Sequence, residues 1–267
     1  MIKLGVNTVL FGNHDFRTAM QHIKWAGFDA AEISALGGMA NHLPLEDWRA
    51  HAADIKAISE DLELPLTAME VGSTSEERLM PAFEAGAEIG IPVVNVGPGG
   101  SKPDDPESLT RLIDQLNAMS EKAAEFGVTL CVKAHVNTGI SNTPNTLEVM
   151  KRVTAPAFGI DMDPSHIQRA GEVPKDALRQ VISRVKHVHI RDCAGPGPRP
   201  GTPEMQACGR GDVDLFGYCK VLVDADYDGP VNLEIIGAKE YELSRQAIIA
   251  AESYGFLNAC LKACGGR

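Results

Sequence analysis

The chain has 267 residues, of which 44% are hydrophobic, and a formal net charge of −11. This length and composition suit one α/β barrel with a sizeable core, whereas the negative charge argues against a nucleic-acid partner, because such a partner is bound by neutralising phosphates. The longest apolar runs, such as Ile91 to Val94, are too short to cross a bilayer, and the first ten residues show a strand-like pattern without a signal peptide. We therefore expect a cytoplasmic protein with no membrane partner.

Short β-rich runs alternate with amphipathic helical patterns along the whole chain. We expect strands at 3–6, 30–33, 66–71, 93–96, 129–134, 158–162, 187–190 and 231–235. We expect helices at 15–25, 45–62, 75–89, 106–126, 143–153, 174–185, 213–223 and 239–261. Gly27, Gly90 and Gly127 each follow a predicted helix, where a left-handed residue is favourable.

These eight strand–helix pairs fill the chain with no composition break, so we predict a single domain over residues 1–267. Such alternation requires a parallel sheet, and eight units of this length favour closure into a single (β/α)₈ TIM barrel. No G-x-G-x-x-G motif follows the first strand, which argues against an open dinucleotide-binding sheet. The six cysteines include no C-x-x-C pair, so we expect free thiols.

Polar residues stand where the predicted strands end, which is where TIM barrels carry their catalytic groups. The eight strand ends, in chain order, offer Asn7, Glu32, Glu70, Asn95, Lys133 with His135, Asp163 with His166, His189 with Arg191, and Glu234. Asp163, His189 and Glu234 supply oxygen, nitrogen and oxygen ligands from three successive strands. That mix suits a divalent ion such as Mn²⁺, Co²⁺, Mg²⁺ or Zn²⁺.

Each of these residues also has a plain structural interpretation. An aspartate at a strand end often caps the following helix, and a histidine near a core often bonds to the backbone. Groups of this kind on four consecutive strand ends nevertheless favour a metal or catalytic site.

The runs FGIDMDPSHI, VKHVHIRD, CGRGDVDLFGY and GPVNLEIIG resemble the last three βα units of the xylose-isomerase-like barrel superfamily. That group includes sugar isomerases and epimerases, inosose dehydratase and endonuclease IV. The resemblance implies that Asp163, His189 and Glu234 bind a metal, that Glu234 also moves a proton, and that His166 contacts the substrate or a second metal. It further implies that the loop 209–211 closes over the barrel mouth.

One position departs from the resembled family, whose isomerases and epimerases usually carry a glutamate at the end of the fifth strand. Lys133 stands there instead. We favour an acid/base or substrate-contact role for Lys133, with its pKa lowered by a nearby metal or by burial. It is otherwise a Schiff-base nucleophile, or an ion-pair partner of Asp163 or Glu234 in a metal-free site.

The sequence thus predicts a metal-dependent isomerase or epimerase, or a related lyase, that acts on a small sugar or polyhydroxy carbonyl compound through an enediolate. We favour an isomerase of carbohydrate metabolism over a lyase. Glu234 or Lys133 would move the proton, while His135, His166 and Arg191 would bind hydroxyls or a carboxylate. The early strand ends lack the histidines of endonuclease IV, so no DNA substrate is expected. A Schiff-base aldolase, a non-catalytic sugar-binding barrel and self-association into a homo-oligomer stay open.

Overall fold

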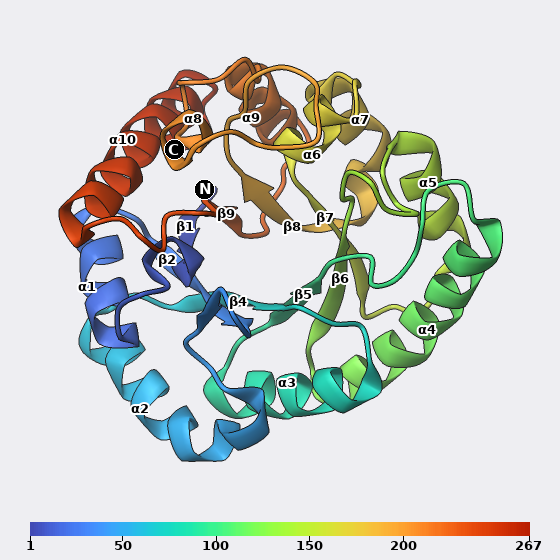
Figure 1. Cartoon of the computed structure of the whole chain (residues 1–267), viewed down its shortest axis with the longest axis horizontal. Helices are drawn as coiled ribbons and strands as arrows, with labels where there is room; N and C mark the ends of the chain where they lie inside the picture. The colour runs from blue at the N-terminus through green and yellow to red at the C-terminus, as the bar shows by residue number, and fades with distance from the viewer.

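The computed structural model describes residues 1–267, and at its centre eight parallel strands close into a barrel (Figure 1). Its strands are β1 (Leu4–Asn7), β2 (Ala30–Leu36), β4 (Leu66–Val71), β5 (Val93–Val96), β6 (Thr129–Lys133), β7 (Phe158–Met162), β8 (Val185–Ile190) and β9 (Val231–Leu233). Neighbouring strands pair in chain order, and β1 pairs with both β2 and β9, which closes the sheet. The predicted (β/α)₈ barrel is confirmed.

Helices form a ring around this barrel (Figure 1). They are α1 (Phe16–Trp25), α2 (Trp48–Asp61), α3 (Glu76–Ile89), α4 (Pro106–Glu125), α5 (Thr143–Arg152), α6 (Pro164–Arg169), α7 (Pro174–Val181), α8 (Pro203–Gln206), α9 (Leu215–Asp224) and α10 (Leu243–Ala263). Gly90 ends α3 with a left-handed φ of 91°, as expected, and at the start of α1 the Asp15 carboxylate accepts from the Thr18 amide. Short 3₁₀ turns at Thr8–Phe11, Leu45–Asp47 and Ile182–Arg184 complete the connections.

Besides the 3₁₀ turns, three elements were not predicted, and all lie in connections at the carboxyl ends of the strands. They are the antiparallel strand β3 (Ala40–Asn41) and the short helices α6 and α8. Each is too short to show a hydrophobic period in the sequence.

The barrel strands are buried on both faces, and nearly all buried apolar side chains belong to one connected core between strands and helices. Inside the barrel, glycines stand near the amino-terminal ends of strands β1 and β7. A Cβ on Gly5 would stand 2.1 Å from Asn232 Oδ1, and one on Gly159 would stand 2.9 Å from Cys131 Sγ. No side chain fits at these two positions, so the long polar side chains inside the barrel lie toward its carboxyl end.

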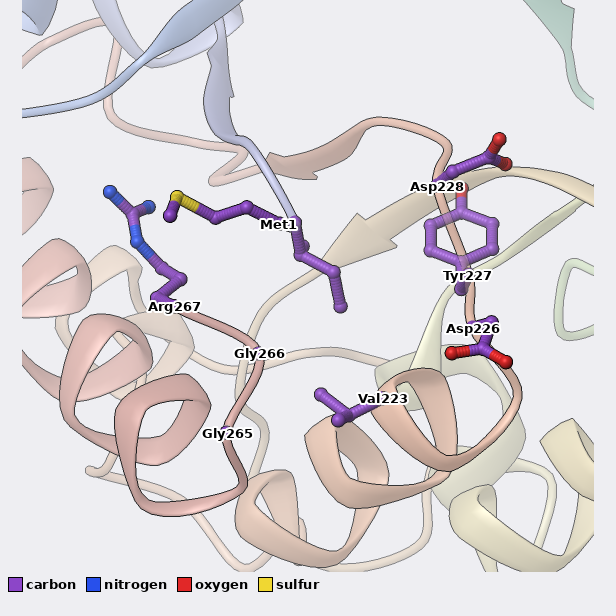
Figure 2. A pocket seen from close by; sticks show the side chains of 9 residues that line it. Met1, Val223, Asp226, Tyr227, Asp228, Gly265, Gly266 and Arg267 are labelled. Carbon is purple, nitrogen blue, oxygen red and sulfur yellow. The ribbon is translucent and has the colours of Figure 1, made fainter.

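The amino-terminal end of the barrel holds a separate cavity of about 310 Å³. Figure 2 shows Met1 and Arg267 on one side of it and Asp226, Tyr227 and Asp228 on the other, so the two ends of the chain meet here. This face of a TIM barrel contributes to stability rather than chemistry. None of the helices combines the length and apolarity that a membrane crossing requires.

Candidate active site

Buried polar side chains fill the carboxyl end of the barrel. Asn7 at the end of β1 donates hydrogen bonds to Glu32 Oε2 (3.1 Å) and Glu70 Oε2 (2.6 Å), and Asn95 donates to Glu32 Oε1. These residues are each at most 7% exposed. The first four strand ends, to which the sequence assigned no role, are thus part of the same network as the last four.

The Lys133 ammonium lies between two carboxylates. Its Nζ donates to Glu70 Oε1 (3.1 Å) and to Glu234 Oε1 (2.9 Å), and the side chain is buried. Burial disfavours the charged amine, but the negative charges of Glu234 and Glu70 outweigh it and raise the pKa of Lys133 above its ordinary value. The predicted lowering of this pKa is therefore wrong, and Lys133 pairs with Glu234, as one interpretation expected, and with Glu70 instead of Asp163; that this site is free of metal stays a prediction.

The two carboxylates on this ammonium differ in acidity. Burial raises the pKa of Glu70 to about 7, against the pull of Lys133, with a further contribution from the charge of Glu234. Burial acts on Glu234 as well, but Lys133 and Arg191 hold the pKa of that carboxyl well below its usual range. Glu70 can therefore exchange a proton near neutral pH while Glu234 stays ionised. Sequence reasoning did not select Glu70, although its place at a strand end was the available signal.

Arg191 connects Asp163, His166 and Glu234. Its guanidinium nitrogens lie 3.0 Å from Asp163 Oδ2, 3.2 Å from Glu234 Oε2 and 2.9 Å from His166 Nε2. The other oxygen of Asp163 accepts from the Ser165 amide at 2.8 Å and so caps α6. Burial and the Arg191 charge lower the pKa of His166 well below its ordinary value, so its neutral ring accepts from the guanidinium.

His135 lies against His166 at the edge of the site, with ring centroids 3.9 Å apart. Its Nδ1 is 2.8 Å from the carbonyl of Val136, and burial lowers its pKa. Two neutral imidazoles thus stand side by side above the buried charges; both nitrogens of His166 face protein donors, and His135 donates from Nδ1 and keeps Nε2 as an acceptor.

His189 carries a positive charge deeper in the barrel. Its Nε2 lies 2.5 Å from Glu32 Oε2 and its Nδ1 lies 3.1 Å from Asp161 Oδ2. Burial favours the neutral ring, but Glu32 and Asp161 outweigh it and raise the pKa of His189 well above its ordinary value. Asp161 also pairs with His187 Nδ1 at 2.9 Å. Sequence reasoning gave Asp161 no role.

Two groups of side chains have ligand atoms close enough to hold a metal ion. They are Glu32 with His187 and His189, and Glu70 with His189 and Glu234. Asp163 belongs to neither, because its Oδ2 faces Arg191.

The three predicted ligands have ligand atoms without hydrogen bonds, although the charged His189 would have to release a proton before its Nδ1 could bind a metal. Asp163 Oδ2, His189 Nδ1 and Glu234 Oε2 are buried and have no hydrogen bond, because the charged groups near them approach outside hydrogen-bond geometry. The donor set therefore fits a divalent ion, which would have to share the site with two resident cations, Lys133 and Arg191. Binding by Asp163, His189 and Glu234 together stays a prediction.

A cavity of about 400 Å³ opens above this network. It is lined by the predicted residues Lys133, His135, His166, Arg191 and Glu234 and also by Leu36, Met39, Glu70, Val71, Gly72, Gly97, Arg169, Pro198, Pro200 and Ile236. Asp163 and His189 do not line it and lie beneath. A volume in this range is typical of sites for small molecules.

The long connection between β8 and α9 covers part of this cavity through Pro198 and Pro200. Its base is fixed by Asp192, whose carboxylate accepts from the amides of Cys193 (2.9 Å), Gly209 (3.0 Å) and Val213 (3.0 Å). A Cβ on Gly211 would stand 2.3 Å from Asp192 Oδ1, so only glycine permits this approach.

Comparison with known proteins places this architecture in a family. The profile described as xylose isomerase-like TIM barrel matches residues 20–260. Inosose dehydratase from Clostridium botulinum is 25% identical over 142 residues, 48% of this chain and 47% of the relative, so the chain spans about half the length of that curated relative. D-psicose 3-epimerase with D-tagatose from Clostridium cellulolyticum H10 superimposes with a TM-score of 0.78 at 17% identity, covering 97% of this chain and 99% of that one. The IOLI protein with a bound zinc atom superimposes with a TM-score of 0.80 at 17% identity and the same coverage. This chain belongs to the xylose isomerase-like TIM barrel family.

Proposed function

We propose that the chain is an enzyme that moves a proton at the carbon beside a carbonyl group in a small polyhydroxylated compound. The observation that carries this proposal is the pair of carboxylates, Glu70 and Glu234, that share the Lys133 ammonium beneath a cavity. The names of the relatives, a dehydratase and an epimerase of sugar-like compounds, support the substrate class.

Glu70 is the group best suited to take the proton. A general base works best when its pKa is near the working pH, and burial raises the pKa of Glu70 to about 7. Removal of a proton from the carbon leaves negative charge on the carbonyl oxygen, as an enediolate. Lys133 donates two of its three N–H groups to the carboxylates, so one donor is left for that oxygen.

Two outcomes follow from the same enediolate. Return of the proton to the neighbouring carbon or to the opposite face gives an isomerase or epimerase, and expulsion of a hydroxyl gives a dehydratase. We favour the first, because Glu70 and Glu234 come from β4 and β9, which are not neighbours in the barrel, and so flank the ammonium. The resemblance to inosose dehydratase makes water elimination the second candidate.

A divalent ion held by His189 and Glu234, with Asp163 as the predicted third ligand, would polarise the carbonyl and its neighbouring hydroxyl. The chain's own residues hold and orient the substrate. Arg191 is placed to bind a hydroxyl or carboxylate at the cavity wall, and His135 and His166 offer neutral imidazoles beside it. The Schiff-base aldolase is disfavoured, because the raised pKa of Lys133 keeps its amine protonated.

The test is solvent exchange. The purified protein is incubated in D₂O with a panel of ketoses and inososes, and deuterium at the carbon beside the carbonyl is followed by NMR. We expect exchange with at least one compound, lost in Glu70→Gln and Glu234→Gln and kept in Glu125→Gln, whose side chain is exposed on α4. A compound that binds the wild type without any exchange or product would instead favour a sugar-binding barrel.

A further inference from the structure

A second hollow of about 500 Å³ lies beside the catalytic cavity. It is formed by the segments 72–75 after β4 and 97–100 after β5, together with Gln115, His135 and Thr138. Apart from Pro98, its walls are glycines and polar side chains, with no aliphatic or aromatic residue. Most pockets for small molecules are predominantly apolar, so this composition is unusual.

The two hollows share part of their lining. Gly72, Gly97 and His135 line both of them. A molecule whose reacting carbonyl lies over Lys133 could therefore extend past these residues into the second hollow.

The second hollow is uncharged. No lysine, arginine, aspartate or glutamate lines it, and burial lowers the pKa of His135, which keeps that ring neutral. On the nearby helix α3, Glu76 and Glu77 occupy the first turn and oppose an anion there. Glu76 pairs with Lys122, so a phosphate group would find no cation among the lining residues and one unpaired carboxylate, Glu77, nearby.

Hydrogen-bonding groups are nevertheless abundant in this hollow. The backbone amides of Gly99 and Gly100 make no hydrogen bond within the chain, and the Ser75 hydroxyl keeps its proton free, whereas Ser73 donates to Ser75 and Thr138 donates to the His135 carbonyl. Hydroxyls both donate and accept, which matches the hydroxyls of a sugar.

We propose that this second hollow binds a neutral sugar ring or polyol chain attached to the reacting unit. The preferred substrate is then a glycoside-sized carbonyl compound, larger than a free monosaccharide and without a phosphate group. This inference extends the proposed function, but it concerns binding and is tested without turnover.

The test compares three ligands that share one ketose: fructose, fructose 6-phosphate and isomaltulose, in which a neutral glucosyl unit replaces the phosphate at the same oxygen. Calorimetry of the wild type should show that isomaltulose binds about tenfold more tightly than fructose. Two or three additional hydrogen bonds to the glucosyl unit account for a factor of this size. Fructose 6-phosphate should bind no tighter than fructose. Tighter binding of the phosphate ester, or isomaltulose binding no tighter than fructose, overturns the inference.

Gly100→Leu fills the second hollow selectively. A Cβ on Gly100 would meet no atom within 4 Å, its backbone is not left-handed, and the residue lines only this hollow. The variant should lose the preference for isomaltulose and keep its affinity for fructose. Gly255→Leu, at an equally open and exposed position on α10, is the matched control and should keep both.

Ser75→Ala provides a second variant that adds no bulk. The Ser75 side chain makes no capping bond to α3, so its loss should leave the helix intact and weaken isomaltulose binding a few-fold. An unchanged preference in both Gly100→Leu and Ser75→Ala contradicts the inference. Failure of deuterium exchange with fructose would count against the proposed function alone.

Discussion

Replacing Glu70 by glutamine should change how the stability of the protein depends on pH. The pKa of Glu70 is raised from an ordinary 4.5 to about 7, so the folded chain keeps a proton that the unfolded chain has already released. Stability from this group is therefore lost as the pH rises from about 4.5 to about 7. A shift of this size corresponds to about 3 kcal/mol of unfolding free energy.

Glu70→Gln removes this pH-dependent loss of stability, although the substitution itself lowers the stability by an amount that is the same at every pH. Glu70 accepts from Lys133 Nζ and from Asn7 Nδ2, and a glutamine amide must turn its NH₂ group toward one of these two donors. Because this cost does not depend on pH, the informative quantity is the difference between variant and wild type at two pH values.

Urea unfolding at about pH 5 and about pH 8 measures this difference, provided that both proteins unfold in one step. The variant should gain about 2.5 kcal/mol relative to the wild type between these conditions, because part of the loss already occurs below pH 5. Glu125→Gln, exposed on α4, should show no such gain. A difference between Glu70→Gln and wild type that is the same at both pH values would refute the assignment of a raised pKa to Glu70.

Three further predictions concern Lys133. Lys133→Met leaves Glu70 and Glu234 buried without their shared cation, so the free energy of unfolding at neutral pH should fall by about 3–5 kcal/mol. A decrease below about 1 kcal/mol would mean that the pair is not buried as described. Lys133→Glu removes a competing cation and adds a carboxylate, so titration calorimetry should show that the variant binds Mn²⁺ at least about tenfold more tightly than the wild type does. An unchanged Mn²⁺ affinity would argue against a metal at this place. Borohydride treatment with a ketose should leave Lys133 unmodified by mass spectrometry because its amine is protonated; a reduced adduct on this residue would revive the aldolase interpretation.

The fold could be predicted from the sequence because its strands have strong local signals. The strands at Leu66–Val71, Val93–Val96 and Phe158–Met162 have the predicted bounds, since each is a compact β-rich run bordered by turn residues. Strand β3 has only two residues and pairs antiparallel with β2, an arrangement that no period in the sequence indicates.

The sequence predicts which residues gather at the carboxyl end of the barrel, but it does not predict which of them contact one another. Parallel strands bring their carboxyl ends together, so Lys133, His135, His166, Arg191 and Glu234 line one cavity. Which residues become partners depends on the closed barrel, because contacts such as Lys133–Glu70 and Lys133–Glu234 join strands that are not adjacent in the sheet. The direction of the Lys133 pKa shift follows from those partners, which is why sequence reasoning gave the wrong sign.

The carboxylate of Asp192 gives the connection from β8 to α9 a practical use in protein engineering. Both ends of the segment 193–212 meet at its base, where the Asp212 amide also donates to the Cys193 carbonyl at 2.9 Å. The entropy of closing a loop changes by only about 0.6 kcal/mol for each doubling of its length. Only the part of this segment around Pro198 and Pro200 can therefore be replaced by longer or shorter versions, because Gln206 bonds to the amide and the carbonyl of Ile236 and Cys208 packs in the core. Grafts of different length would reshape the mouth through Pro198 and Pro200 and leave the buried carboxylates untouched.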